Sequence, residues 1–111
     1  MNAAQRALST FRQPPYMHTC AQTICAAFGR EDLLEDMKKQ SGGRADGGTC
    51  GALHAAMHLA GDDAPQIEEA FRTALGATRC RELKGGDPPV PCQLCVKTAA
   101  ELLEKLFESK A

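Results

Sequence analysis

Apolar residues recur at helical spacing along most of this chain, in short segments that glycine and proline residues separate. Aromatic residues make up only 5% of the sequence and tryptophan is absent, so alanine, leucine, methionine and cysteine must fill the interior. These side chains favour closely packed helices, because sheets draw on β-branched and aromatic residues. The sequence therefore predicts an all-α fold, a compact bundle of about five to six short helices with Gly/Pro-rich connecting loops.

The positions of the prolines and glycines predict where these helices begin and end. A chain of 111 residues fits one domain, residues 1–111. Thr49 is expected to cap a helix that begins at Cys50, and the segments 41–48 and 85–91 are expected to be irregular. Helices are predicted at residues 3–11, 16–28, 31–40, 50–60, 65–75 and 92–108.

The charge pattern argues against two classes of partner. Thirteen basic and fourteen acidic residues are interspersed and give a formal net charge of only −1, so neither nucleic acid nor an anionic membrane surface is an expected partner. The N-terminal residues contain no apolar stretch like that of a signal peptide, and no run of apolar residues is long enough to cross a membrane. We expect a soluble, cytoplasmic protein.

Six cysteines are many for a chain of this length. In a reducing compartment they indicate metal binding or thiol chemistry rather than a framework of structural disulfides. A single cysteine often packs as a small apolar side chain, so the functional interpretation depends on several of them converging. Cys20, Cys50 and the pair Cys92 and Cys95 lie on or beside predicted inward helix faces. Cys80 lies in a predicted loop between two arginines, which favours a thiolate.

The surroundings of Cys50 are the most informative. It follows Gly47, Gly48 and Thr49 and is expected in the first turn of a helix, where free backbone N–H groups and the helix dipole stabilise a thiolate. We therefore predict a thiol pKa for Cys50 below the ordinary value of about 8.5. Its reactivity should exceed that of Cys25, which we interpret as a structural cysteine at the edge of its helix stripe.

The string Cys50-Gly51-Ala52-Leu53-His54-Ala55 resembles the core of the redox-active family named for its C-GCAxxG-C-C cysteine pattern, with Ala55 in place of the last glycine. The other cysteine motifs follow in the family's order: Cys20-Ala21-Gln22, Cys80-Arg81-Glu82-Leu83, and finally Cys92 or Cys95, of which Cys92 is preferred. The resemblance covers about residues 16–108. It implies a cysteine-bound iron–sulfur cluster, because the same domain occurs in electron-transfer cytochromes with such a cluster. The chain has no C-x-x-C-H motif, so a haem role does not carry over.

Three functions remain open at this stage, in order of preference. The first is electron transfer through a 2Fe-2S cluster held by Cys20, Cys50, Cys80 and Cys92, with Cys95 as the alternative fourth ligand. The second is a thiol-disulfide oxidoreductase with Cys50 as the nucleophile, and the third is a structural zinc module that serves as an interaction domain. A redox partner protein is expected, and a homodimer is left open.

The three histidines give a weaker signal. His54 and His58 lie one helical turn apart, a spacing that can bind a metal, but no glutamate completes a zinc-enzyme motif. We therefore expect a partly exposed pair on a helix flank. His18 is expected to serve only local packing.

Overall fold

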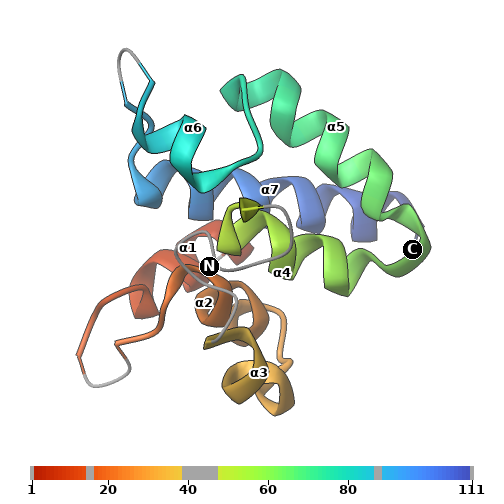
Figure 1. Cartoon of the computed structure of the whole chain (residues 1–111). Helices are drawn as coiled ribbons and strands as arrows, with labels where there is room; N and C mark the ends of the chain where they lie inside the picture. Colours follow the sequence, from red (N-terminus) through yellow and green to blue (C-terminus); the bar gives the residue numbers. More distant parts are fainter. Residues whose placement is uncertain (1, 15–16, 39–47, 87–88, 111) are drawn as a thin grey trace.

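The fold is described from a computed structural model, for residues 2–14, 17–38, 48–86 and 89–110 (Figure 1). Every regular element among these residues is a helix, and the only strand-like pairing there consists of two isolated bridges, Phe11 with His18 and Thr49 with Arg79. The prediction of an all-α fold is confirmed. The longer helices are α1 (Ala3–Thr10), α2 (Cys20–Ala27), α4 (Gly51–Ala60), α5 (Ala64–Leu75) and α7 (Cys92–Lys110). The shorter ones are η1 (Glu31–Leu33), α3 (Leu34–Lys38), η3 (Gly61–Asp63) and α6 (Cys80–Lys84).

Helix α2 begins after a side-chain cap at Thr19. The Thr19 hydroxyl accepts the Gln22 backbone N–H at 3.3 Å, and the Gln22 side chain accepts the Thr19 N–H at 3.1 Å. Cys20 is therefore the first residue of the helix. The prediction that this helix starts at residue 16 is wrong, because Met17 adopts a left-handed conformation with φ 50°, and its side chain is 58% exposed. Tyr16 lies outside the described residues.

The start of α4 also differs from the prediction by one residue. Cys50, rather than Thr49, is the capping residue. Thr49 instead forms the bridge with Arg79, and the Cys50 N–H donates to the Thr78 carbonyl at 2.8 Å. These backbone contacts hold the beginning of α4 beside the beginning of α6.

Glycines end two helices as the sequence predicts. Gly61 follows α4 with φ 62°, and Gly76 follows α5 in the left-handed conformation with φ 87°, which other residues adopt only under strain. Two irregular segments are predicted, 41–48 and 85–91. In the first of them, Gly48 is the only described residue. The described part of 85–91 contains no helix. The helix predicted at 31–40 is observed as η1 and α3, which end at residue 38 of the described chain.

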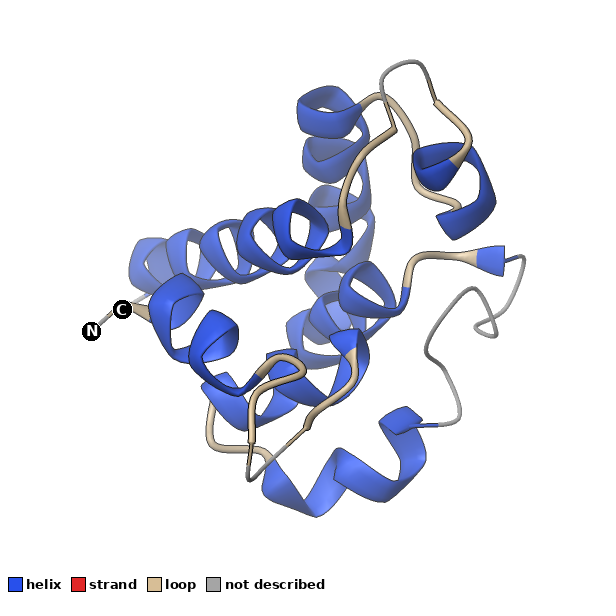
Figure 2. Cartoon of the chain, turned by 90° about the vertical axis from the view of Figure 1, so that its left-hand side faces the viewer, coloured by secondary structure: helices blue, strands red, loops and turns tan. Residues whose placement is uncertain are grey.

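Helix α7 contacts α1, α2, α4 and α5. Figure 2 draws the described chain as helices joined by loops and turns, with no strand. The interfaces are lined by small side chains, which let the helix backbones approach closely. The alanines with no exposed surface are Ala3, Ala7, Ala21, Ala52, Ala55, Ala56, Ala99 and Ala100.

The phenylalanines occupy different environments. Phe71 on α5 has no exposed surface and is the largest fully buried side chain of the described core. Phe107 on α7 is 39% exposed, and its ring meets that of Phe28 edge-on with centroids 5.6 Å apart. It therefore covers the edge of the core instead of filling it.

No helix of the described residues combines the length and the apolar character that crossing a membrane requires.

These environments predict unequal costs for truncating two phenylalanines. Phe71→Ala should lower the free energy of unfolding by about 3–5 kcal/mol, because it leaves a cavity in a closely packed interior. Phe107→Ala, the matched control, should cost about 1 kcal/mol, since its ring is already partly in water. Urea denaturation of both variants measures the difference, and Phe71→Leu replaces Phe71→Ala if the latter does not fold. Equal costs for the two positions would contradict the assignment of Phe71 to the core.

Candidate functional site

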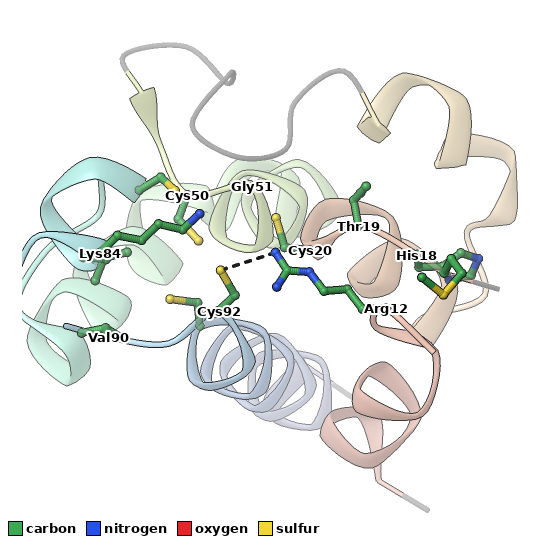
Figure 3. A pocket seen from close by; sticks show the side chains of 13 residues that line it. Arg12, His18, Thr19, Cys20, Cys50, Gly51, Lys84, Val90 and Cys92 are labelled. Carbon is green, nitrogen blue, oxygen red and sulfur yellow. Dashed lines mark hydrogen bonds between the residues drawn. The ribbon is translucent and has the colours of Figure 1, made fainter. Parts of the chain in front are cut away.

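Five of the six cysteines line one pocket, a cavity of about 300 Å³ between the beginnings of several helices. In Figure 3 the sulfur atoms of Cys20, Cys50 and Cys92 are directed into the same space. The pocket thus brings together every cysteine that the sequence singles out as a site residue. The five are Cys20, Cys50, Cys80, Cys92 and Cys95.

These cysteines share a position in the local structure. Cys20, Cys80 and Cys92 are the first residues of α2, α6 and α7, and Cys50 caps α4. Cys95 lies one turn into α7. The expectation that Cys80 lies in a loop is wrong, since the backbone turns into α6 at this residue. The long-range packing of the helices brings these beginnings together, so residues about 30 positions apart in sequence line one cavity.

Within the pocket, Cys50 and Cys95 interact, and the pKa values of their thiols shift in opposite directions. Both are buried, with 5% and 3% of their surface exposed. The hydrogen bond from Cys95 is the main cause that lowers the pKa of Cys50 to about 7, and burial opposes it. The N–H groups of Leu53 and Ala52 and the charge of Lys84 lower it further.

The partner thiol is affected in the opposite direction. The pKa of Cys95 is raised, first because its thiol is hydrogen bonded to Cys50 and then because burial disfavours its charged form. At neutral pH the pair therefore consists of a Cys50 sulfur that ionises readily and a protonated Cys95 donor. The prediction of a lowered pKa at Cys50 is confirmed, although the second thiol contributes more to it than the helix terminus does.

The other cysteines differ from this pair. Burial raises the pKa of Cys80, so the expectation of a favoured thiolate between Arg79 and Arg81 is wrong. Both arginine side chains are exposed, and Arg79 is 3.8 Å from a Glu82 carboxylate oxygen, which offsets its charge. Cys25 does not line the pocket. It has no exposed surface, rather than lying at the edge of its stripe, and burial raises its pKa to about 11.

Two basic side chains that the sequence interpretation missed flank the sulfurs. Figure 3 shows Arg12 and Lys84 reaching into the pocket from opposite sides. The Arg12 Nη2 donates to the Cys92 Sγ at 4.0 Å, and its guanidinium lies 4.8 Å from the centre of the Phe11 ring. Lys84 follows Cys80 by one helical turn, a spacing that could have indicated it. Arg12 gives no such signal in the sequence. It reaches the pocket through its own left-handed backbone conformation, with φ 53°, just after the end of α1.

The histidines contribute little to this site. His54 is partly buried and His58 is exposed, and neither lines the pocket. His18 does line the pocket, whereas the sequence predicts only a local packing role for it. As placed, the His, Cys, Asp and Glu side chains of the described residues include no group of three or more that could hold a metal ion.

Comparisons with protein-family models, curated proteins and solved structures find no match to this chain. The roles of its residues are therefore argued from the geometry of the pocket. The resemblance to the C-GCAxxG-C-C family stays a prediction.

The hydrogen-bonded pair predicts the pH dependence of cysteine labelling. Alkylation of Cys50 in the reduced protein should rise through a midpoint near pH 7, because the thiolate is the reactive form. Cys25 should stay unlabelled at that pH, since its pKa is about 11. A pH series of alkylation rates, with mass spectrometry to locate the label, measures both.

Two variants on α7 test what lowers the pKa of Cys50. Cys95→Ala removes the hydrogen bond and should move the Cys50 midpoint upward, toward that of an ordinary thiol. Cys92→Ala, the matched control, should leave the midpoint in place. A Cys95→Ala midpoint that stays near pH 7 would show that other groups lower the pKa of Cys50.

Proposed function

We propose that this chain is a thiol-based redox protein in which Cys50 and Cys95 interconvert between a dithiol and a disulfide. The observation that carries the proposal is that these two buried thiols, from the beginnings of different helices, line the same pocket, where each shifts the pKa of the other. A disulfide between them would have an S–S bond of about 2.05 Å. Of the three functions that the sequence leaves open, thiol-disulfide exchange needs no further ligand.

The reaction that this pair supports has two steps. The Cys50 thiolate attacks one sulfur of a disulfide, forms a mixed disulfide and releases the other sulfur as a thiolate. Cys95 then loses its proton to solvent or to the released thiolate and attacks the Cys50 sulfur, which releases the second thiol. One disulfide is reduced to two thiols, and the protein dithiol is oxidised to a disulfide.

The electrostatics of the pair suit this order of events. Cys50 is the better nucleophile because its pKa is lowered, whereas Cys95 is held protonated. Once Cys50 is part of a mixed disulfide, it no longer carries the charge that the Cys95 proton stabilises. The main cause that raises the pKa of Cys95 is then removed, and Cys95 becomes able to attack.

Thiol-disulfide exchange also suggests a compartment and a partner for the protein. All six cysteines are free in the structure, which is compatible with a reducing compartment such as the cytoplasm. A redox partner protein would restore the dithiol after each cycle. The resemblance to a redox-active family supports the same general function.

The proposal predicts distinct products for two variants. Reduced protein treated with hydroxyethyl disulfide should lose two thiols and yield a Cys50–Cys95 disulfide in peptide maps. Cys95→Ser should stop at a mixed disulfide on Cys50. Cys50→Ser should react about a hundredfold more slowly at neutral pH, because a thiol whose pKa lies two or more units above the pH is about 1% ionised. Cys25→Ser is the control and should behave like the unsubstituted chain.

A different product would contradict the assignment. If Cys95→Ser still forms an internal disulfide between Cys50 and another pocket cysteine, then Cys95 is not the resolving thiol. If Cys50→Ser retains the full rate, then Cys50 is not the nucleophile.

A cysteine-bound metal is the second candidate, because five thiols line one pocket into which no described carboxylate projects. A 2Fe-2S cluster on Cys20, Cys50, Cys80 and Cys92 or Cys95 would give electron transfer, and zinc would give a structural interaction module. The described side chains would have to move closer together to bind either one. The residues therefore fit this candidate less well than they fit the dithiol.

Metal analysis and a visible spectrum after anaerobic purification separate the two candidates. Under the metal proposal, Cys20→Ser and Cys80→Ser should each lose the bound iron or zinc, since a four-thiolate site loses a full ligand. Under the dithiol proposal the protein is free of metal, and both variants still form the Cys50–Cys95 disulfide. Cys25→Ser is the control in both cases. Stoichiometric iron with sulfide would overturn the dithiol proposal in favour of the cluster, and stoichiometric zinc would favour the structural module.

A further inference from the structure

The position of Cys50 limits the size of the disulfide that can reach it. Only 5% of its surface is exposed, and it lines the pocket. A small disulfide enters such a pocket more readily than a disulfide held on the surface of a folded protein. The pocket volume of about 300 Å³ is at the lower end of the range for small-molecule sites. These dimensions favour a small disulfide as the substrate.

The charges around the pocket favour an anionic substrate. Among the described residues that line it, Arg12 and Lys84 carry full positive charges and none carries a carboxylate. Neither of the two forms an ion pair with an acidic side chain of the described residues. Both charges are thus available to a ligand, and they approach the sulfurs from opposite sides (Figure 3). An arginine and a lysine placed in this way suit a molecule with a carboxylate at each end.

The remaining walls suit the uncharged part of such a molecule. Leu83, Val90 and the exposed Met17 also line the pocket. Apolar walls with a few polar groups are typical of small-molecule sites, where the polar groups orient the ligand.

We propose that the substrate is a low-molecular-weight disulfide that bears carboxylates, of the size of an oxidised cysteine-containing peptide, and that Arg12 and Lys84 bind those carboxylates. This inference rests on the proposed dithiol function and adds its substrate class. The Cys50 thiolate attacks the bound disulfide and releases one anionic thiol, and Cys95 then displaces the second. The balance is one dithiol and one small disulfide converted to one protein disulfide and two small thiols.

The test compares three disulfides of different charge on the reduced full-length chain: oxidised glutathione (anionic), hydroxyethyl disulfide (neutral) and cystamine (cationic). Each rate of Cys50–Cys95 disulfide formation is divided by the rate of the same reagent with a small reference thiol. The reference thiolate repels an anionic disulfide as the Cys50 thiolate does, so without a binding site for anions the three normalised rates should be similar. We expect the anionic disulfide to be the most accelerated, with an advantage that is smaller at high salt.

Substitution of the basic residues locates the effect. Arg12→Gln and Lys84→Gln should each reduce the ratio of anionic to neutral rates by about twofold to fivefold, the range for partly exposed ion pairs. Because Lys84 also lowers the pKa of Cys50, the ratio and not the absolute rate is the readout. Lys97→Gln is the matched control, since Lys97 is exposed on α7 outside the pocket and should leave the ratio unchanged.

The possible results separate this inference from the function on which it rests. If the cationic disulfide is the most accelerated, or if neither Arg12→Gln nor Lys84→Gln changes the ratio, the substrate class is wrong while the dithiol function stands. If none of the three reagents forms the Cys50–Cys95 disulfide, the dithiol function itself is overturned.

Discussion

The close packing of small side chains between α2, α4 and α7 is the constraint on which the rest of this structure depends. These three helices contact one another in pairs, and fully buried alanines lie along their interfaces. Bulky side chains would hold the backbones apart, whereas alanines let them approach closely at a packing density near that of a crystal. Since each of these helices begins at or directly after a cysteine, their close approach places three sulfurs around one cavity.

A comparison of Cys25 and Cys50 shows what determines thiol chemistry in this fold. Both are buried, and burial alone raises the pKa of a thiol, as it does for Cys25, to about 11. The pKa of Cys50 is instead lowered to about 7, below that of an ordinary thiol. The hydrogen bond from Cys95 and the nearby N–H groups outweigh the desolvation cost. A buried sulfur is therefore reactive only where donors are already oriented toward it.

Much of the fold could be predicted from the sequence because it depends on local signals. The glycines at positions 61 and 76 both end helices with a positive φ, which glycine adopts without strain, and helical periodicity identifies α5 and α7 within a few residues. Errors arose where a local signal competes with backbone geometry. Met17 fits the helical stripe, but its left-handed backbone conformation prevents a helix there. Thr49 is a good capping residue by type, but it pairs with Arg79 and leaves the cap position to Cys50.

The sequence by itself determined that the chain is helical and that Cys50 lies at the beginning of a helix, where backbone N–H groups lower its pKa. Both properties depend on residues a few positions apart, whose geometry the helix dictates. Only the tertiary structure decided that Cys95, rather than Cys92, is hydrogen bonded to Cys50, and that Arg12 and Lys84 flank the sulfurs. Those contacts join segments from distant parts of the chain. Their geometry depends on how the helices pack, which no local pattern of residues specifies.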